Sequence, residues 1–274
     1  MSLTFLRRIL FAACGAYLSL VMAMMILETR LVYPAPPARD VAPKAGEREF
    51  TCQSADGATV HGWILEGLPN RPAIVVFHGN AEDVPRVARD FGREMCDQFE
   101  ATVLVFDFRW YGRTSGIPDE KSVLDDGEAM VRAFATELKT NPDQLVFFGR
   151  SLGGGLATGV ADRTGAGMLI LDRTFDALDC AAAANYPWIP TRLVMCNHFR
   201  SDLILPRLTM PLFQSHFVND EITPLPNAER LFGLAASPVK TFVRLDKGTH
   251  LSDMPDEWWN QAKAFLDLHA PKIQ

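Results

Sequence analysis

The residues best suited to chemistry in this sequence are a serine between glycines, a late histidine, and an aspartate between the two along the chain. The serine is Ser151, in the run Gly149-Arg150-Ser151-Leu152-Gly153. A G-x-S-x-G run between a buried strand and a helix is typical of a nucleophile, because the tight turn lifts the serine oxygen above the sheet. Gly149 and Gly153 would nearly touch in this turn, where only glycine leaves room. We therefore predict Ser151 as a nucleophile; a flexible glycine-rich turn with an incidental serine is the alternative.

A serine hydroxyl is a poor nucleophile at neutral pH and needs an adjacent base, and the base needs an acceptor that fixes its tautomer. His250 follows the last predicted strand and precedes the last predicted helix, so it lies on a loop at the active end of the sheet. The other histidines fall in strands, loops or the last helix: His61, His78, His198, His216 and His269. We therefore predict His250 as the base.

Two aspartates at strand ends could orient the imidazole of His250. Asp220 follows a buried strand and precedes Pro224, with a helix after it. Asp172 ends another strand, and its alternative role is to cap a helix or brace a loop. We favour Asp220, because the order Ser151, Asp220, His250 is the one expected when the serine sits on this kind of turn.

Two backbone N–H groups are predicted to stabilise the negative charge that develops on a substrate carbonyl. His78-Gly79-Asn80-Ala81 follows a predicted strand, and Gly79 would let the backbone turn inward so that the N–H of Asn80 points at this charge. The N–H of Leu152, directly after the nucleophile, is the second predicted donor. His78 is expected to brace the loop rather than to transfer protons.

These residues depend on an alternation of strands and helices. Continuous apolar runs predict buried strands, and helix-spaced apolar residues predict the helices between them. The predicted strands are Glu49–Ser54, Thr59–Glu66, Ala73–Phe77, Thr102–Phe106, Leu145–Phe148, Met168–Leu171, Leu212–Phe217 and Val239–Leu245. The predicted helices are Asp83–Gln98, Val123–Leu138, Leu152–Ala161, Asn227–Phe232 and Glu257–His269. This order predicts an α/β fold with a mostly parallel sheet, helices on both faces, and a site at the carboxyl ends of the strands.

The N-terminal segment predicts a membrane anchor. The run Ile9–Leu27 has no charged residue and follows the pair Arg7-Arg8. As a helix it would span about 28 Å, close to the hydrocarbon thickness of a bilayer. A cleaved signal peptide is the alternative, but its apolar region is usually shorter, and the best small-x-small site, at Val21–Ala23, lies inside the run. We predict an uncleaved single-pass anchor at residues 1–30, and the arginine pair favours an extracytoplasmic catalytic domain.

Residues 31–274 predict one domain, since no repeat or linker divides them. Tyr33-Pro34-Ala35-Pro36-Pro37 is typical of a stiff, extended spacer. The excursion at about residues 174–210 carries the apolar run Tyr186-Pro187-Trp188-Ile189-Pro190 and is where a small cap over the nucleophile would lie. Its apolar side chains would suit an acyl chain; the alternative is that they only pack the cap onto the domain.

Composition and charge exclude several other classes of protein. The net charge is −6 and no Lys/Arg run is longer than two, so the concentrated basic face that nucleic-acid binding needs is missing. The five cysteines are scattered without a C-x-x-C pair, which predicts neither a zinc site nor a disulfide framework. We interpret Cys180 and Cys196 as two ordinary buried thiols; a disulfide between them in an oxidising compartment is the alternative. We expect no metal and no cofactor, since a serine mechanism needs none.

Together these motifs resemble the α/β-hydrolase superfamily. The resemblance covers the chain from about Leu31 to the end and rests on His78-Gly79-Asn80-Ala81, Asp107-Phe108-Arg109-Trp110-Tyr111-Gly112-Arg113-Thr114-Ser115-Gly116, Gly149-Arg150-Ser151-Leu152-Gly153-Gly154, Asp220 with Pro224, and Gly248-Thr249-His250. The branch it looks most similar to is the membrane-anchored ABHD-type serine hydrolases, which share a short N-terminal anchor followed by a Tyr-Pro segment. Trp110 and Phe217 stand where that pattern usually has glycine, and they are expected to narrow or reshape the pocket.

The resemblance implies a serine hydrolase that cleaves carboxylic esters or thioesters, with lipid-like acyl substrates reached from the membrane. Its branch includes esterases, lysophospholipases, monoacylglycerol lipases and protein thioesterases. Peptidase relatives make a serine peptidase the alternative among enzymes. A non-catalytic, membrane-tethered scaffold is the alternative from a different class, and it predicts that Ser151 does not react with a fluorophosphonate.

Overall fold

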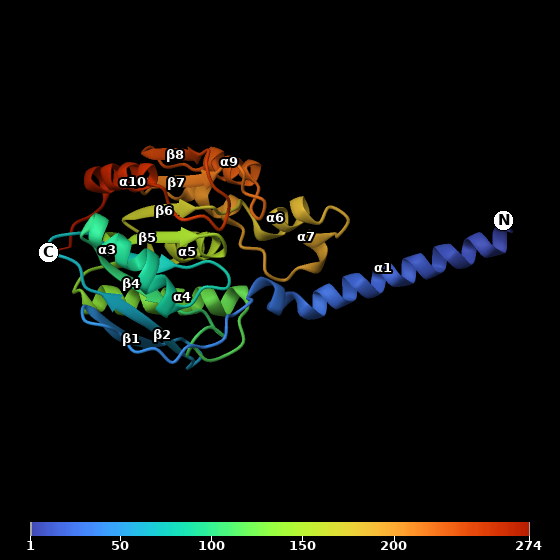
Figure 1. Ribbon diagram of the computed structural model, residues 1–274, viewed down its shortest axis with the longest axis horizontal. Coiled ribbons are helices and arrows are strands. Elements are labelled where there is room, and N and C mark those ends of the chain that lie inside the picture. The colour runs from blue at the N-terminus through green and yellow to red at the C-terminus, as the bar shows by residue number, and fades with distance from the viewer. Residues whose placement is uncertain (1, 274) are drawn as a thin grey trace.

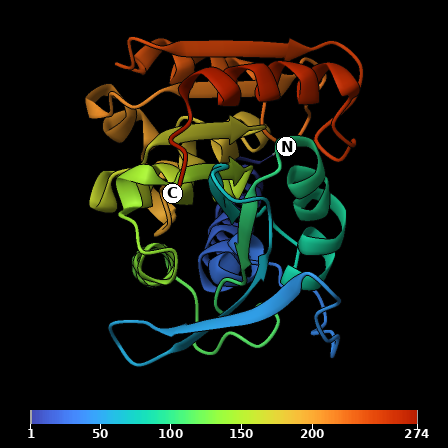
Figure 2. The same cartoon turned by 90° about the vertical axis from the view of Figure 1, so that its left-hand side faces the viewer.

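A single central sheet organises the chain. The computed structural model describes residues 2–273, and within them eight strands lie in the order β1-β2-β4-β3-β5-β6-β7-β8 (Figures 1 and 2). The strands are β1 Glu47–Gln53, β2 Thr59–Leu65, β3 Ala73–Phe77, β4 Thr102–Phe106, β5 Val146–Arg150, β6 Met168–Asp172, β7 Leu212–Phe217 and β8 Lys240–Leu245. β2 pairs antiparallel with β1 and β4, and all pairs from β4 to β8 are parallel. The predicted α/β fold with a mostly parallel sheet is therefore confirmed.

The strands at the centre of the sheet are apolar because helices cover both of their faces. Every residue of β3 and β6 is buried, and such strands read as continuous apolar runs rather than as alternating patterns. The prediction for β3, β4 and β7 matches their observed bounds, and the other strands differ by one or two residues. Parallel pairing brings the carboxyl ends of β3, β5, β6, β7 and β8 to one edge of the sheet, where the predicted site residues follow them.

Helices form a layer on each face of the sheet, as Figure 2 shows. The helices that cover the sheet include α3 Arg93–Phe99, α4 Glu120–Glu137, α5 Leu152–Thr164, α9 Leu225–Leu234 and α10 Asp256–His269. One hydrophobic core lies between the sheet and α4, α5 and α9, and includes Phe134 and Leu156. The second core lies under α3 and α10 and includes Phe99 and Trp258. A short 3₁₀ helix, η2 Pro142–Gln144, precedes β5.

The prediction of a single helix at Asp83–Gln98 is wrong in one respect, because the observed helix is interrupted. It consists of α2 Val84–Val87, a π-helical turn η1 Ala88–Gly92, and α3. A π turn adds a residue to the helical repeat, which a pattern of apolar spacing does not reveal. The turn contains Phe91, whose ring packs on Phe148 of β5 at 4.8 Å between ring centroids. This turn thereby lies beside the strand that leads to Ser151.

Two further segments project from the domain on the same side (Figure 1). The first is α1 Leu3–Val32, a 30-residue helix that is long and apolar enough to cross a membrane. The second is the stretch of residues 174–210 between β6 and β7, called the cap segment below. It contains α6 Leu178–Asn185, α7 Thr191–Val194, α8 Ser201–Ile204 and the 3₁₀ turn η3 Leu205–Arg207, none of which the sequence pattern predicted. Helices this short are marginal alone and depend on tertiary contacts, which sequence periodicity does not record.

Candidate active site

Ser151 sits at the tip of a sharp turn between β5 and α5. Its φ is +53°, in the left-handed region that side chains with a Cβ rarely occupy. The backbone holds it there: Ser151 N–H donates to the carbonyl of Asp172 at 2.9 Å, and its own carbonyl accepts from Thr174 Oγ1 at 2.8 Å. A strained backbone conformation of this kind persists only where the surrounding contacts hold the residue in place. Residues with such strain are found mainly at functional sites.

The glycines of the motif make the turn sterically possible. A Cβ on Gly153 would lie 2.0 Å from the carbonyl oxygen of Phe77, and a Cβ on Gly149 would lie 2.5 Å from the carbonyl oxygen of Gly153. These contacts are with backbone atoms, which cannot rotate away. The predicted close approach of Gly149 and Gly153 therefore describes the turn that the structure contains.

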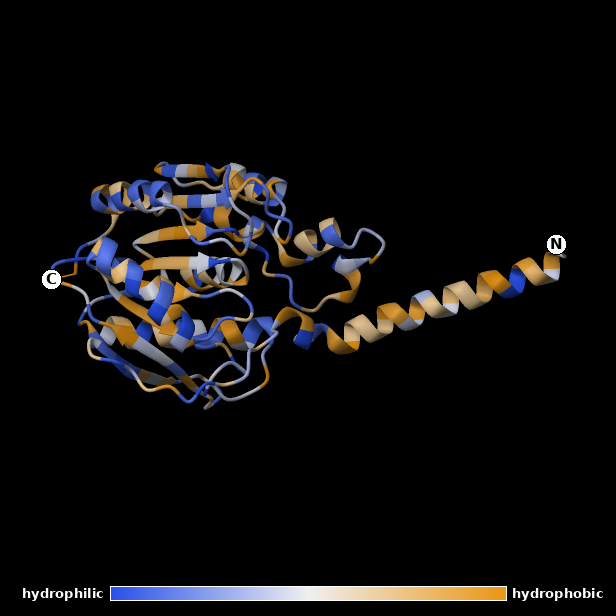
Figure 3. Cartoon of the chain, viewed as in Figure 1, coloured by the Kyte–Doolittle hydropathy of each residue, from blue (hydrophilic) through white to orange (hydrophobic). Residues whose placement is uncertain are grey.

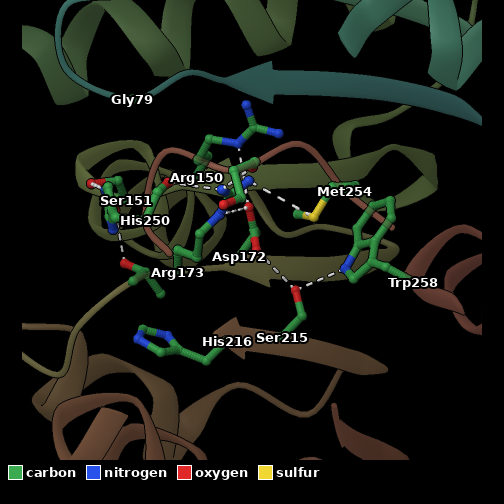
Figure 4. Close-up of polar contacts among 12 residues, drawn as sticks. Gly79, Arg150, Ser151, Asp172, Arg173, Ser215, His216, His250, Met254 and Trp258 are labelled. Atoms are coloured by element: carbon green, nitrogen blue, oxygen red, sulfur yellow. Dashed lines mark hydrogen bonds and ion pairs between the residues drawn. The ribbon is translucent and has the colours of Figure 1, made fainter. Parts of the chain in front are cut away.

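His250 lies between Ser151 and Asp220. Its Nε2 is 3.0 Å from Ser151 Oγ, and its Nδ1 is 2.7 Å from Asp220 Oδ2 (Figure 4 shows the Ser151 and His250 side chains together). If Nδ1 carries the proton and donates to Asp220, Nε2 has a free lone pair that can accept the hydroxyl proton of Ser151. The structure thus brings together the three side chains that the sequence predicted as a triad.

Asp220 is fixed by the turn that follows it. Its Oδ1 accepts the backbone N–H groups of Ile222 and Thr223, and Thr223 Oγ1 is 3.0 Å from Oδ2. Burial acts to raise the pKa of Asp220, but the hydrogen bond and charge of His250 and the N–H of Thr223 outweigh it, and the net direction is down. The carboxylate is therefore held in the ionised form that can stabilise an imidazolium. His216, expected to be packed or hydrogen-bonded within its strand, is buried with Nε2 2.7 Å from the carbonyl of Thr223.

Asp172, the alternative acid, faces a different group. Its Oδ2 lies 2.8 Å from Nε of Arg173 and 3.3 Å from Nε of Arg150, and its Oδ1 accepts from Ser215 Oγ at 3.0 Å. Ser215 in turn accepts the indole N–H of Trp258 at 2.8 Å, and Figure 4 shows this chain of contacts. Asp172 is therefore the counter-ion of two arginines at the base of the site.

Arg173 connects this buried network to the loop that carries His250. Its guanidinium donates to the backbone carbonyls of His250 at 2.8 Å and of Ser252 at 2.7 Å, and it lies over the ring of Phe217 at 5.1 Å. The side chain is buried, so these bonds exchange little with water. Arg173 therefore ties the loop after β8 to the end of β6 and limits where the imidazole can lie.

The loop after β3 presents the predicted oxyanion donors. The N–H of Gly79 is occupied, because it donates to Glu82 Oε2 at 2.7 Å. Within residues 2–273 the N–H of Asn80 has no hydrogen-bond acceptor, and Leu152 is the first residue of α5, whose N–H has no partner within the helix. His78 is fully buried and stacks on Phe108 with ring centroids 4.1 Å apart, which agrees with a bracing role.

Glu82 and Arg150 balance each other's charge beside the nucleophile. Arg150 Nη1 is 3.4 Å from Glu82 Oε1, and its guanidinium lies 4.1 Å from the centroid of the Phe91 ring. Burial acts to raise the pKa of Glu82, but the charge of Arg150 and the N–H of Gly79 prevail and lower it. The carboxylate of Glu82 therefore stays charged and fixes the loop after β3. The positive charge of Arg150 balances the negative charge of Glu82 near the nucleophile.

A groove of about 640 Å³ opens beside Ser151, and is called the nucleophile groove below. Besides Ser151 and His250 it is lined by residues that include Asn80, Phe91, Arg150 and Met254. The expectation that Trp110 and Phe217 narrow this pocket is wrong, because neither lines it. Trp110, at φ +71°, lies beside the Tyr33–Pro37 spacer, and Phe217 is buried under Arg173.

Four residues that support the site were not predicted as functional: Glu82, Arg150, Arg173 and Thr223. Thr223 had a signal, since Asp followed by Thr three residues later is typical of a side chain that caps its own turn. Arg150 ends β5 and is paired with Asp172 in the sheet, and Arg173 directly follows Asp172, but only the folded structure shows that both guanidinium groups reach this carboxylate. No group of three or more His, Cys, Asp or Glu side chains in residues 2–273 could hold a metal ion. All five cysteines are free, and the interpretation of Cys180 and Cys196 as buried thiols is wrong, because Cys196 is exposed and Cys180 is half-buried.

A strained serine at the carboxyl edge of a mostly parallel sheet, with a histidine after the last strand, defines the α/β-hydrolase class. The family model described as alpha/beta hydrolase fold matches residues 72–251. An uncharacterized protein of Mycobacterium tuberculosis is 30% identical over 226 residues, covering 79% of this chain and 78% of that protein. The chain belongs to the alpha/beta hydrolase family.

Other relatives agree with this assignment. The alpha/beta hydrolase domain-containing protein WAV2 of Arabidopsis thaliana is 24% identical over 264 residues, covering 88% of this chain and 84% of that protein. Among solved structures, an esterase of Pyrococcus furiosus superposes with a TM-score of 0.70 at 16% identity, covering 86% of this chain and 97% of the esterase. A likeness at that identity shows the shared fold.

Proposed function

We propose that this protein is a membrane-anchored serine hydrolase that cleaves carboxylic esters or thioesters of lipid-like acyl substrates. The observation that carries the proposal is the line of contacts from Ser151 Oγ through His250 to Asp220, at 3.0 and 2.7 Å. In the first step His250 Nε2 accepts the proton of Ser151 while Oγ attacks the carbonyl carbon. The imidazolium then gives this proton to the leaving alcohol or thiol, and water hydrolyses the acyl-enzyme by the same route.

The N–H groups of Asn80 and Leu152 are proposed to bind the carbonyl oxygen as it becomes negative. Both donors are backbone groups that have no acceptor within residues 2–273, so no hydrogen bond within these residues has to break when the oxyanion forms. Glu82 supports this role indirectly, because it occupies the neighbouring N–H of Gly79 and fixes the loop.

The proposed anchor is α1, retained in the mature protein. Two polar side chains of α1 bind the cap segment: Tyr17 Oη donates to the carbonyl of Trp188 at 2.9 Å, and Glu28 Oε1 accepts the N–H of Cys196 at 2.8 Å. A leader peptide that is removed has no need of such contacts. The pair Arg7-Arg8 favours a cytoplasmic N-terminus, and the catalytic domain then lies outside the cytoplasm.

The test is whether Ser151 is a reactive serine and which bonds the protein cleaves. Full-length protein in detergent micelles is treated with a fluorophosphonate probe, and the labelled peptide is identified by mass spectrometry. We expect labelling at Ser151, loss of labelling in Ser151→Ala, and turnover of p-nitrophenyl esters. Turnover of aminoacyl or prolyl amides above that of esters would favour a peptidase, and no reaction with either the probe or the esters would favour a non-catalytic scaffold.

Removing the N–H of Asn80 should cost far more activity than removing its side chain. Asn80→Pro deletes the donor and is expected to lower kcat by about 10²–10³-fold, whereas Asn80→Ala keeps it and should stay close to wild type. Initial rates with p-nitrophenyl butyrate give kcat, and the melting temperature checks that both variants fold. Equal losses in the two variants would show that the side chain, not the N–H, is what matters.

A further inference from the structure

The C-terminal half of α1 is docked on the catalytic domain. Glu28, which is buried, accepts three N–H groups with Oε1: those of Cys196 and Asn197 at 2.8 and 2.9 Å and the side-chain amide of Asn197 at 3.0 Å. Tyr33 Oη donates to Asn197 Oδ1 at 2.9 Å. A carboxylate that satisfies two backbone donors and an amide at once fixes one geometry. The helix and the cap segment therefore form one unit on this side of the molecule.

Between α1 and the cap segment lies a second, mainly apolar groove of about 480 Å³, called the anchor groove below. This volume falls in the range of roughly 300–1,000 Å³ that is typical of ligand sites. Its walls come from both segments and include Leu20, Ala23, Leu27, Ala182, Ile189 and Met195. Figure 3 shows the apolar colouring of α1 next to the cap helices. A groove of this size and lining would accept a hydrocarbon chain.

The anchor groove and the nucleophile groove share one residue, Asn80, which lines both. Its N–H is the proposed donor to the carbonyl oxygen of a substrate, so both grooves border the place where the reacting carbonyl would lie. The leaving group has to face His250, because the imidazolium gives it the proton. The nucleophile groove has both polar and apolar walls and carries three carboxylates, Asp90, Glu94 and Asp253, whereas the anchor groove is mainly apolar. The acyl chain therefore points away from His250, toward Asn80 and the anchor groove.

The position of the anchor groove along α1 suits a substrate that comes from the bilayer. Thirty helical residues span about 45 Å, which exceeds the roughly 30 Å of a hydrocarbon core. If the uncharged run Ile9–Leu27 lies in the hydrocarbon, the groove walls between Leu20 and Leu27 lie at its edge nearest the domain. The carbonyl of Trp188 accepts from Tyr17, in the middle of this run, so the tip of the cap segment reaches the level of the hydrocarbon, and Tyr186 and Trp188 are exposed there.

We infer that the anchor groove binds the acyl chain of a bilayer lipid, so that the membrane helix forms one wall of the substrate site. This inference rests on the proposed hydrolase function. It assigns α1 a second role beyond anchoring: the acyl chain slides from the hydrocarbon into the groove without crossing water, and its ester carbonyl reaches Asn80 and Ser151. The cap segment forms the opposite wall.

The direct test uses a fluorophosphonate that carries a long alkyl chain with a terminal diazirine. Full-length protein in lipid nanodiscs is labelled, irradiated and digested, and the crosslinked peptides are identified by mass spectrometry. We expect crosslinks from the Ser151 adduct to α1 at residues 20–31 or to the cap segment at residues 178–195. Labelling of Ser151 with crosslinks only elsewhere would overturn the acyl-chain site and leave the hydrolase function standing. Absence of labelling at Ser151 would overturn both.

Variants that fill the anchor groove give an independent test. Ala23→Trp and Ala182→Trp place an indole in the groove from opposite walls. Each is expected to lower kcat/KM for a p-nitrophenyl palmitate substrate by about tenfold or more, because several methylenes lose their binding surface, while p-nitrophenyl acetate is cleaved as before. Ile26→Trp, on the exposed face of α1, is the matched control and should change neither rate. An unchanged palmitate-to-acetate ratio in both groove variants would refute the inference, and retained acetate turnover shows that the variants fold.

Discussion

Replacing Ser151 or His250 by Ala is expected to lower kcat for a short-chain ester by about 10⁶-fold, and the double replacement should cost no more than either alone. The reason is that the two side chains act as one unit. Without the imidazole, the hydroxyl 3.0 Å away keeps its proton, and without the hydroxyl there is no atom to attack the carbonyl. The backbone donors of Asn80 and Leu152 remain in all three variants, so a small residual rate is expected. Initial rates with p-nitrophenyl butyrate measure the effect.

Two matched control variants separate this loss of catalysis from a loss of the folded structure. Ser115 is an exposed serine on the loop after β4, and His269 lies at the end of α10, so Ser115→Ala and His269→Ala should keep the wild-type rate. Melting temperatures of all variants in the same detergent show whether the fold survives. A His250→Ala variant that retains a tenth or so of the activity would contradict the role of His250 as the base, since loss of a general base costs at least about 10²-fold.

The parts of the fold that the sequence predicted are those set by local chemistry. The strand at Ala73–Phe77 was predicted to the residue, because an unbroken apolar run of this length after Pro72 fits a strand covered on both faces better than a helix. The turn around Ser151 was predicted because only glycine fits at Gly149 and Gly153, a constraint that a one-letter pattern records. Ser151 and His250 each follow a strand, so parallel pairing alone brings them to one edge.

The parts that could not be predicted depend on contacts between distant segments. Glu28 binds Cys196 and Asn197 across 168 and 169 positions of sequence, and a charged residue at the end of an apolar run gives no sign of such a partner. The short helices of the cap segment have no period long enough to detect. The π turn that contains Phe91 adds one residue to a helix whose apolar spacing looks regular.

The predicted effect of bulk at Trp110 and Phe217 failed for a related reason. The sequence shows that a large side chain replaces a glycine, but not the direction in which that side chain points. Trp110 adopts φ +71°, a conformation that favours glycine, and turns toward the spacer after α1. Phe217 lies beneath the guanidinium of Arg173, where it supports the loop of His250 instead of the groove wall. The sequence gives the size of a side chain, but the direction in which the side chain points depends on how it packs in the folded protein.

The choice between the two strand-end aspartates can be tested by a pair of isosteric changes. Asp220→Asn is expected to lower kcat by about 10⁴-fold. The amide can donate to Nδ1 of His250, which moves the imidazole proton to Nε2, and Nε2 then has no lone pair for the hydroxyl of Ser151. The amide also lacks the charge that stabilises the imidazolium. The fold should change little, since Asn retains an oxygen for the N–H groups of Ile222 and Thr223.

Asp172→Asn should have the opposite profile, with a lower melting temperature and nearly normal chemistry. Its carboxylate is the counter-ion of the buried guanidinium of Arg173, and removing one charge of a buried pair is strongly destabilising. The imidazole of His250 keeps its own partner, Asp220, and the bond from Arg173 to the carbonyl of His250 does not depend on the charge of Asp172. In the folded fraction kcat should fall by no more than about tenfold, or about 1.4 kcal/mol of activation free energy. Should Asp172→Asn abolish turnover while Asp220→Asn leaves it intact, the acid of the triad would be Asp172, and the 2.7 Å contact between His250 and Asp220 would have only a structural role.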